Sequence, residues 1–262
     1  MLEDSPPSSQ SFARIILDEA GSTNTEAFQR AAAGEPGPLW IMARRQTQGR
    51  GRSGRHWASA PGNLHASLLQ RLACPQAVVH QLSLLAGVAV VESIIAAAGS
   101  TRLAGLRLKW PNDVLIGAAK CAGILPESHS GGRAPEVVVV IGIGINLASH
   151  PPGLGRAATD LAAHGAAVTP EAMLAILAPA VQRWLTIWDC GRGFAAVRAA
   201  WLAHGGAVGE SLTVDTGRDR IAGTFLDLDA GGALLMRDAQ GLERKLTFGD
   251  VTLAHATPKD AG

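Results

Sequence analysis

The segment from Arg44 to Trp57, RRQTQGRGRSGRHW, constrains the fold more than any other part of the chain. It contains five arginines and three glycines but no acidic residue. Glycine lets the backbone approach a ligand closely, and arginine binds phosphate or carboxylate through paired hydrogen bonds. Because this composition disfavours helix and strand, we expect an anion-binding loop between two strands at 39–43 and 64–72. A solvated basic loop or an RNA contact is the alternative.

The remaining composition excludes several classes of protein. The chain has 262 residues, of which 47% are hydrophobic, and a net charge of +1. This is enough apolar material for a core, and it excludes a disordered or fibrous chain. The balanced charge gives no reason to expect nucleic acid or an anionic membrane as a partner. The longest apolar run, 137–148, is shorter than the roughly 20 residues needed to cross a bilayer.

The cysteines and the N-terminal segment indicate the cellular compartment in which the protein is found. Cys74, Cys121 and Cys190 are odd in number and far apart. This argues against a disulfide framework and for a reducing environment. Residues 1–11 are rich in Pro and Ser and lack the apolar stretch of a signal peptide. We therefore expect a cytoplasmic protein with a disordered leader over 1–11.

Helix and strand signals alternate through the first 206 residues. Thr23 and Glu26 have the spacing of a capping box, which predicts a helix from Thr23 that stops at Gly34. Further helices are predicted over 81–98, from Thr169-Pro170 onward, and over 194–204. Strands are predicted over 106–110, 114–116, 122–125 and 136–145, with a turn at 130–132 before the last of them.

The sequence changes character from about Val208. Five short strand-like pieces follow, separated by polar or glycine-containing turns: SLTVDT, IAGTFLDLD, GALLMRD, ERKLTFG and DVTLA. Pieces of this length and spacing are typical of a small β-barrel. We therefore predict an α+β chain, with a mixed α/β domain over 12–206 and a small all-β domain over 207–257.

A second motif, KWPNDV at 109–114, is followed by Lys120. The chain has only four lysines against nineteen arginines, so two lysines within twelve residues indicate a need for a compact charge. Lysine suits a phosphate or a polarised carbonyl, and Asp113 on a turn suits Mg²⁺ beside phosphates. The alternative is that Asn112 and Asp113 form only a turn and Lys109 a solvated strand end.

A third motif, IGIGIN at 141–146, alternates isoleucine with glycine. In a strand, this pattern leaves one face without side chains, so a flat ring or another strand can lie against it. Asn146 at the strand end suits an adenine edge or a backbone cap. No helix follows the glycines, so this is not a dinucleotide fingerprint. The eight histidines are scattered without metal-ligand spacing, and the sequence has no GxSxG, Walker A or CxxC motif.

Together these motifs resemble those of biotin protein ligases. QGRGRSGRHW, KWPNDVLIGAAKCAGIL and GIGINL occur in that order and spacing, with STN at 22–24 upstream. The resemblance covers residues 20–150 and extends weakly to FGDV at 248–251. It implies the mixed-sheet catalytic domain of the biotin/lipoate protein ligase type, followed by a small SH3-like β-barrel.

The resemblance also implies a reaction in two steps. The biotin carboxylate attacks the α-phosphate of ATP, with Mg²⁺ as the ion, to give biotinyl-5′-AMP and pyrophosphate. A specific lysine of a biotin carboxyl carrier protein then attacks this mixed anhydride and releases AMP. Positive charge concentrated where the two anions meet suits this chemistry. The reaction needs no covalent intermediate with the enzyme.

Site roles follow from the same resemblance. Arg52 and Lys120 would be catalytic, and Asp113 would hold the metal. The residues implied for biotin are Ser22, Thr23, Asn24, Gln46, Arg50, Gly51, Arg52, Lys120, Gly123, Ile124 and Leu125. Those implied for ATP are Arg52, Arg55, Trp57, Lys109, Asn112 and Asn146.

The chain departs from the family pattern at three points. His65 stands where many members have an aromatic residue, and the segment after GIGINL has no Trp to cap the adenine. The segment before Phe12 is too short for a DNA-binding helix-turn-helix, so a monofunctional ligase is expected, without DNA or membrane partners. A homodimer is left open as its oligomeric state. The alternatives are a lipoate or octanoate ligase or transferase and, from another class, a non-catalytic nucleotide- or RNA-binding module.

Overall fold

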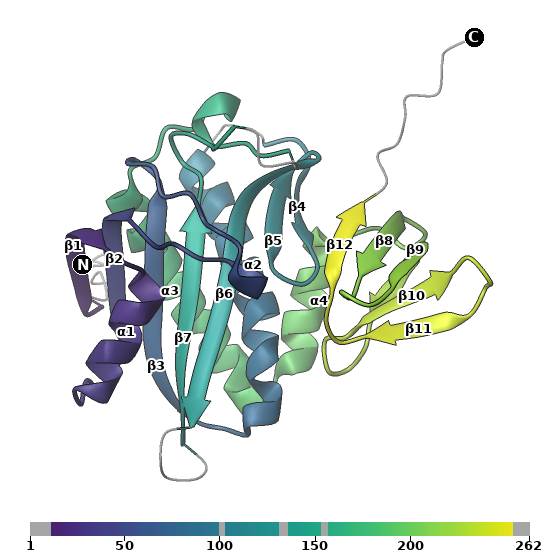
Figure 1. The fold of residues 1–262 in the computed structure, drawn as a ribbon, viewed down its shortest axis with the longest axis horizontal. Coiled ribbons are helices and arrows are strands. Elements are labelled where there is room, and N and C mark those ends of the chain that lie inside the picture. The colour runs from purple at the N-terminus through teal and green to yellow at the C-terminus, as the bar shows by residue number, and fades with distance from the viewer. Residues whose placement is uncertain (1–11, 100–102, 131–135, 153–156, 254–262) are drawn as a thin grey trace, which may run out of the picture.

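Two separate β-sheets organise the chain (Figure 1). The computed structural model describes residues 12–99, 103–130, 136–152 and 157–253. The predicted leader over 1–11 therefore lies outside the described residues. The first sheet and its helices comprise β1 (Arg14–Ala20), α1 (Thr23–Ala32), β2 (Leu39–Gln46), β3 (Leu64–Ala73), α2 (Leu82–Ala98), β4 (Leu106–Lys109), β5 (Asp113–Ile116), β6 (Ala119–Ser130), β7 (Glu136–Ile145), α3 (Pro170–Trp188) and α4 (Phe194–His204).

The first sheet has seven strands in the order β1-β2-β3-β7-β6-β5-β4. Only β1 and β2 run parallel, and every other neighbouring pair is antiparallel. The sheet is therefore mixed, as predicted. The two strands predicted on either side of the turn at 130–132 are β6 and β7, and they pair antiparallel. The turn predicted at 130–132 lies mostly outside the described residues.

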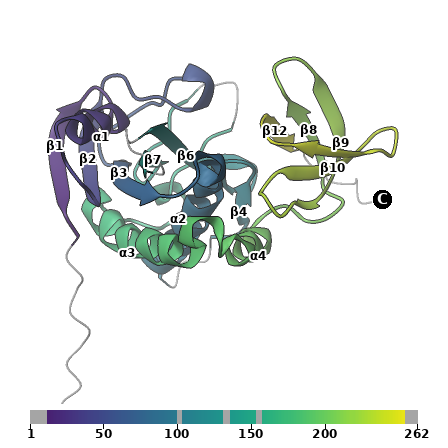
Figure 2. The same ribbon diagram turned by 90° about the horizontal axis from the view of Figure 1, so that it is seen from below.

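Helices cover both faces of this sheet (Figure 2). On one face, α2 and α3 pack against the sheet and each other, with Leu85 of α2 and Leu177 of α3 fully buried. On the other face, α1 packs on β2, β3 and β7 through Ala27, beside Ile41 and Val140. The site-forming loops are thus anchored to a sheet that is buried on both sides over much of its width.

Helix α2 forms most of the one candidate membrane-spanning segment among the described residues. The segment Gln76–Ala98 is long and apolar enough to span a bilayer, but 72% of its most apolar window is buried inside the fold. Its end at Gly99, with φ of 59°, is as predicted. The segment is the central core helix of this domain.

The predicted capping box at the start of α1 is wrong. Ser22 occupies the N-cap and makes no side-chain cap hydrogen bond. The Thr23 hydroxyl instead donates to Gln46 Oε1, at 3.1 Å. Glu26 pairs with Arg30 one turn later, at 2.8 Å. At α3, by contrast, the predicted N-cap is confirmed, because Thr169 Oγ1 accepts a hydrogen bond from the backbone N–H of Ala172 at 3.2 Å.

The five strand-like pieces at the C-terminal end form a second, antiparallel sheet, ordered β11-β10-β9-β8-β12. Its strands are β8 (Ser211–Asp215), β9 (Arg220–Leu228), β10 (Leu234–Asp238), β11 (Glu243–Leu246) and β12 (Asp250–Leu253). This sheet lies beside β4 and α4 in Figure 1. The α+β class is confirmed, while closure into an SH3-like barrel and the boundary at 206/207 stay predictions.

Candidate functional site

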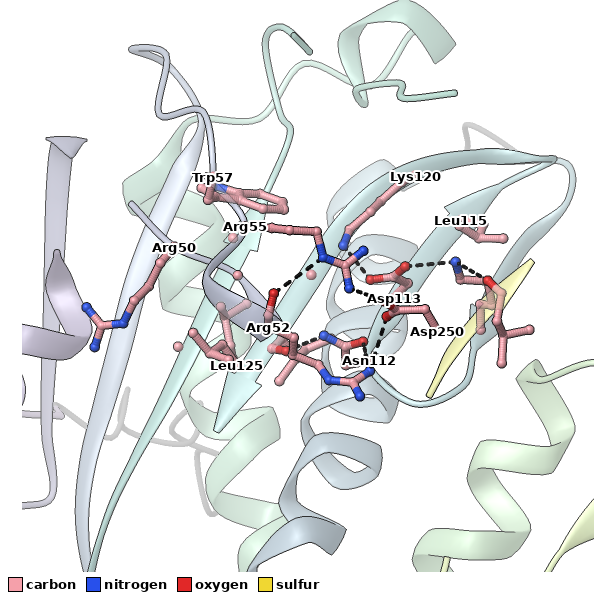
Figure 3. Close-up of a pocket in the computed structure, with 18 of the residues that line it drawn as sticks. Arg50, Arg52, Arg55, Trp57, Asn112, Asp113, Leu115, Lys120, Leu125 and Asp250 are labelled. Carbon is pink, nitrogen blue, oxygen red and sulfur yellow. Dashed lines mark hydrogen bonds and ion pairs between the residues drawn. The ribbon is translucent and has the colours of Figure 1, made fainter. Parts of the chain in front are cut away.

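A cavity of about 1040 Å³ opens above the first sheet and reaches the second (Figure 3). It is lined by the loop rich in arginine and glycine that follows β2 (residues 47–57, called the Arg/Gly loop), the strands from β4 to β7, the start of α1 and strand β12. Every predicted site residue except Asn146 lines it. The structure thus brings together three motifs that lie far apart in the sequence.

Strand register explains how the motifs meet. One row of Cα partners crosses five strands, from β3 to β4, in the order His65, Gly144, Gly123, Asp113, Lys109. Residues in one such row share a face of the sheet. Because two members are glycines, the middle of the row is bare and its two ends carry polar side chains. The row forms the floor of the cavity.

The bare floor receives the indole of Trp57. A methyl group on Gly144 would stand 2.5 Å from two carbons of the Trp57 ring, and one on Gly123 would stand 3.1 Å from another. The sequence prediction that a flat ring can lie against these glycines is confirmed, and the ring is supplied by the protein itself. The Trp57 Nε1–H donates to His65 Nδ1 at 3.4 Å. Burial lowers the pKa of His65, which favours the neutral ring needed to accept that hydrogen bond.

A polar network fills the end of the cavity near α1. Gln46 Oε1 accepts hydrogen bonds from the backbone N–H of Thr23, at 2.8 Å, and from its hydroxyl. The Ser67 hydroxyl lies 2.7 Å from Thr23 Oγ1 and 2.6 Å from Asn24 Oδ1. Ser67 is completely buried and was missed by sequence reasoning, although it is the β3 partner of Gly142 in the IGIGIN motif. The network fixes the orientation of the polar side chains that face the cavity.

Glu127 on β6 is a second residue that sequence reasoning missed. Its Oε2 accepts hydrogen bonds from Asn24 Nδ2, at 2.6 Å, and from an Arg50 guanidinium nitrogen, at 2.9 Å. Arg50 also donates to Thr25 Oγ1 at 2.7 Å, so its side chain turns away from Lys120 and Asp113 (Figure 3). Strand alternation was the available signal, because residues 123, 125 and 127 share one face of β6.

The two lysines of the second motif meet on one carboxylate. Lys109 Nζ lies 2.9 Å from Asp113 Oδ2, and Lys120 Nζ pairs with Asp113 Oδ1. Burial opposes ionisation of Asp113, but the charges of Lys120 and Lys109 outweigh it and lower its pKa to about 2. The carboxylate is therefore ionised near neutral pH and holds both ammonium groups at the cavity wall.

This arrangement does not fit a resident magnesium ion. Both oxygens of Asp113 face ammonium groups, and the described part of the chain contains no cluster of three or more His, Cys, Asp or Glu side chains suited to a metal. Magnesium is usually held by one or two carboxylates together with substrate phosphates. Asp113 as a metal ligand stays a prediction, and we assign no step to the ion.

Two arginines of the Arg/Gly loop contact the second sheet. An Arg55 guanidinium nitrogen lies 2.5 Å from Asp250 Oδ2, and Arg52 donates to the Gly249 carbonyl at 3.3 Å. Arg52 also donates to Asn112 Oδ1 at 3.3 Å. Asp250 was given no role from the sequence, although it lies in the FGDV motif. Contacts between residues so far apart in the chain have no local sequence signal.

Not every predicted residue reaches the cavity. Asn146 is buried at 3% exposure, and its Nδ2 donates to the Thr159 carbonyl at 2.9 Å. A role for Asn146 at the adenine stays a prediction. Arg44 and Arg45 of the predicted loop also lie outside the cavity. They belong to β2, which extends to Gln46, and they pair with Glu171 and Glu19, respectively.

Comparison with known proteins agrees with this geometry. Residues 20–146 match the biotin/lipoate A/B protein ligase family. A biotin–[acetyl-CoA-carboxylase] ligase of Paracoccus denitrificans is 40% identical over 232 residues, covering 86% of this chain and 95% of the relative. Another, of Mycobacterium tuberculosis, is 32% identical, covering 90% of this chain and 87% of the relative.

A solved structure gives the same result. The biotin protein ligase from Aquifex aeolicus, in complex with biotin and ATP, superposes with a TM-score of 0.75 at 26% identity. The match covers 93% of this chain and 99% of that protein. This chain therefore belongs to the biotin/lipoate A/B protein ligase family, among its biotin protein ligases.

Proposed function

We propose that this chain joins biotin to ATP to form biotinyl-5′-AMP and then transfers biotin to a lysine of a biotin carboxyl carrier protein. The observation that carries the proposal is the continuity of the cavity. An end lined by hydroxyl and amide groups and an end lined by lysine and arginine share one space. This suits a ligand that has a polar ring system and a carboxylate that must meet a nucleotide. Biotin and ATP are accordingly the substrates that we assign.

The polar end is proposed to hold the bicyclic rings of biotin. Ser22, Thr23 and Asn24 provide hydroxyl and amide groups. Gln46 and Ser67 orient Thr23 and Asn24, and Arg50 donates a hydrogen bond to the Ser22 hydroxyl. The ureido group needs both donors and acceptors, and these side chains offer both. Gly123, Ile124 and Leu125 line the adjoining wall, where the thioether ring would pack.

The cationic end is proposed to perform the activation. Lys120 and Arg52 are the residues that we assign to the point where the carboxylate attacks the α-phosphate, and their charges would stabilise the negative charge of that transition state. Because Asp113 holds Lys120 in place before the substrates arrive, little reorganisation is needed during the reaction. Arg55 and Lys109 would bind the phosphates that leave as pyrophosphate.

Acyl transfer through a cysteine does not suit this chain. Burial raises the pKa of Cys74 to about 11 and that of Cys121 to about 12. Both thiols are therefore protonated near neutral pH, and none of the three cysteines lines the cavity. Direct attack of the carrier lysine on the mixed anhydride, with AMP as leaving group, is the second step that we propose.

Exchange of radioactive pyrophosphate into ATP tests the activation step. The assay is run with magnesium-ATP and, separately, biotin, lipoate, octanoate or no acid. Exchange that requires biotin is the expected result. Exchange with lipoate or octanoate instead would keep the adenylation but change the substrate. Folded protein without exchange in any of these reactions would contradict the enzymatic proposal.

We also propose that the protein acts in the cytoplasm. All three cysteines are free, and Cys74 and Cys121 are buried. Free buried thiols are typical of proteins in a reducing compartment. Fractionation of the native host cells would test this, and recovery of the protein in a membrane or exported fraction would contradict it.

A further inference from the structure

The cavity extends beyond the residues assigned to biotin and ATP. Past Lys109, its wall continues to Arg107, two residues earlier on β4, and both side chains line it. Alternate residues of a strand share a face, and Leu108 between them is buried in the core. The outer arm of the cavity therefore carries a cation to which the proposed function gives no role.

Strand register relates Arg107 to the proposed reaction centre. Arg107 is the Cα partner of Leu115 on β5, which is the partner of Lys120 on β6. Neighbouring strands are about 4.8 Å apart, so the backbones at Arg107 and Lys120 are about 10 Å apart. Lys109 lies about 7 Å from Arg107 along β4, at about 3.3 Å per residue. Three cations thus occupy one patch of the sheet face.

Arg107 is held in a way that leaves part of its guanidinium unused. One of its terminal nitrogens pairs with Glu210 Oε2 at 2.5 Å, and Glu210 precedes β8 of the second sheet. The Arg107 Nε atom is buried and has no hydrogen-bond partner among the described residues. Glu210 also lines the cavity. The pair therefore faces the same space as the proposed phosphate ligands, although the buried Nε atom is not accessible from that space.

The geometry of phosphoryl substitution indicates which anion would reach this arm. An attacking group and a leaving group lie roughly in line on opposite sides of the phosphorus. Biotin would approach from the α1 and β2 end of the cavity. Pyrophosphate would then depart in the opposite direction, toward β4 and β12, where Lys109 and Arg107 lie.

We propose that Arg107 forms an outer subsite for the departing pyrophosphate, and that Glu210 competes with pyrophosphate for Arg107. This inference rests on the proposed function for its choice of ligand. Arginine binds phosphoryl oxygens through charge-assisted hydrogen bonds, so pyrophosphate held between Lys109 and Arg107 takes the place of Glu210 at the terminal guanidinium nitrogens. When pyrophosphate leaves, Glu210 takes back the guanidinium, so the free site does not retain its product tightly.

Two substitutions at this pair have opposite expected effects. Arg107→Gln removes the proposed ligand, whereas Glu210→Gln removes only its competitor. Binding of pyrophosphate to the unliganded protein is measured by isothermal titration calorimetry. Arg107→Gln is expected to weaken binding by about tenfold, in line with a lost hydrogen bond between charged groups, and Glu210→Gln to tighten it several-fold. The apparent KM for pyrophosphate in the exchange assay should shift in the same two directions.

Asp227→Asn is the matched control. Asp227 on β9 pairs with Arg198 on α4, so this ion pair also connects the first domain to the second sheet. Unlike Arg107 and Glu210, neither residue lines the cavity. The control should leave pyrophosphate affinity unchanged. If Arg107→Gln and Glu210→Gln both weaken binding, or neither changes it, the pair is only a structural contact and the inference is wrong.

Calorimetry separates this inference from the proposed function. If pyrophosphate binding depends on Arg107 but biotin supports no exchange, the subsite stands and the ligase proposal fails. If biotin-dependent exchange occurs but Arg107→Gln binds pyrophosphate as tightly as the wild type, the ligase proposal stands and the subsite fails.

Discussion

Trp57 packs so closely on Gly144 that a methyl group on this glycine would stand 2.5 Å from two carbons of the indole. Gly144→Ala is therefore expected to displace Trp57 from the cavity floor and to raise the KM for biotin and ATP by about tenfold or more. Gly231→Ala is the control, because its added methyl group would come no closer than 3.4 Å to a described atom outside its chain neighbours. Unchanged KM values for Gly144→Ala would show that the position of Trp57 does not matter for binding.

Lys120→Ala is expected to abolish most adenylate formation. Removing one positioned group that stabilises developing charge typically costs about 10²–10³ in rate. The fold should survive, because Asp113 keeps its ion pair with Lys109. Biotin-dependent pyrophosphate exchange measures the loss, and thermal unfolding checks the fold. Lys245→Ala, which removes a lysine paired with Asp229 in the second sheet, should retain full exchange.

Arg52→Gly is expected to weaken retention of the adenylate. Arg52 joins the Arg/Gly loop to Asn112 and to the Gly249 carbonyl, so its loss opens one side of the cavity. Released adenylate would then label lysines on bystander proteins. The off-rate of biotinyl-5′-AMP and biotin incorporation into added albumin measure both effects. Arg45→Gly, on β2 and outside the cavity, is the control, and a wild-type off-rate in Arg52→Gly would refute this role.

Glu127→Ala is expected to raise the KM for biotin by about tenfold while changing kcat much less. Glu127 Oε2 orients both Asn24 and Arg50 but does not itself line the cavity, so its effect passes through these two side chains. Glu127→Gln keeps an acceptor and should recover part of the affinity. Glu136→Gln is the control, since Glu136 pairs with Arg71 outside the cavity. A fall in kcat alone would argue against the positioning role.

His65 is expected to make the protein less stable as the medium becomes acidic. Burial lowers its folded-state pKa below the usual value of 6.5. Below pH 6.5, the unfolded chain binds a proton that the folded protein does not. The free energy of unfolding therefore falls with decreasing pH until the folded-state pKa is reached, by at most about 1.4 kcal/mol per pH unit.

Urea unfolding between pH 7.5 and 5 measures this dependence. His65→Asn keeps a side-chain acceptor for Trp57 but does not titrate, so its unfolding free energy should fall less steeply over the same range. Parallel pH profiles of the two proteins would show that His65 does not contribute.

The sequence was sufficient to predict those parts of the site that rest on local patterns. The isoleucine–glycine alternation of residues 141–145 identified a bare strand face. The Arg/Gly loop lies between two strands as predicted, but its predicted start was wrong, because β2 continues to Gln46. Both patterns depend on strand alternation and backbone conformation, which neighbouring residues largely determine. The weak C-terminal strand signals likewise predicted a second sheet.

Features that depend on contacts distant in the sequence could not be predicted. The capping box at Thr23 failed because Gln46 and Ser67, from neighbouring strands, bond its hydroxyl instead. The contact of Asp250 with Arg55 joins residues 195 positions apart. Such contacts follow from sheet order and domain packing, which no local pattern specifies.

The position of Asp250 has a consequence for synthesis of the protein. Residues 249–251, at the start of β12, contact three cations of the cavity. Gly249 contacts Arg52, Asp250 contacts Arg55, and Val251 contacts Lys109. During translation, the cavity therefore lacks one of its walls until residues 249–251 have emerged from the ribosome. A nascent or prematurely terminated polypeptide would carry the complete Arg/Gly loop without the carboxylate that pairs with it. Synthesis through residue 251 is thus a condition for a finished pocket, and products that end before it would lack this wall.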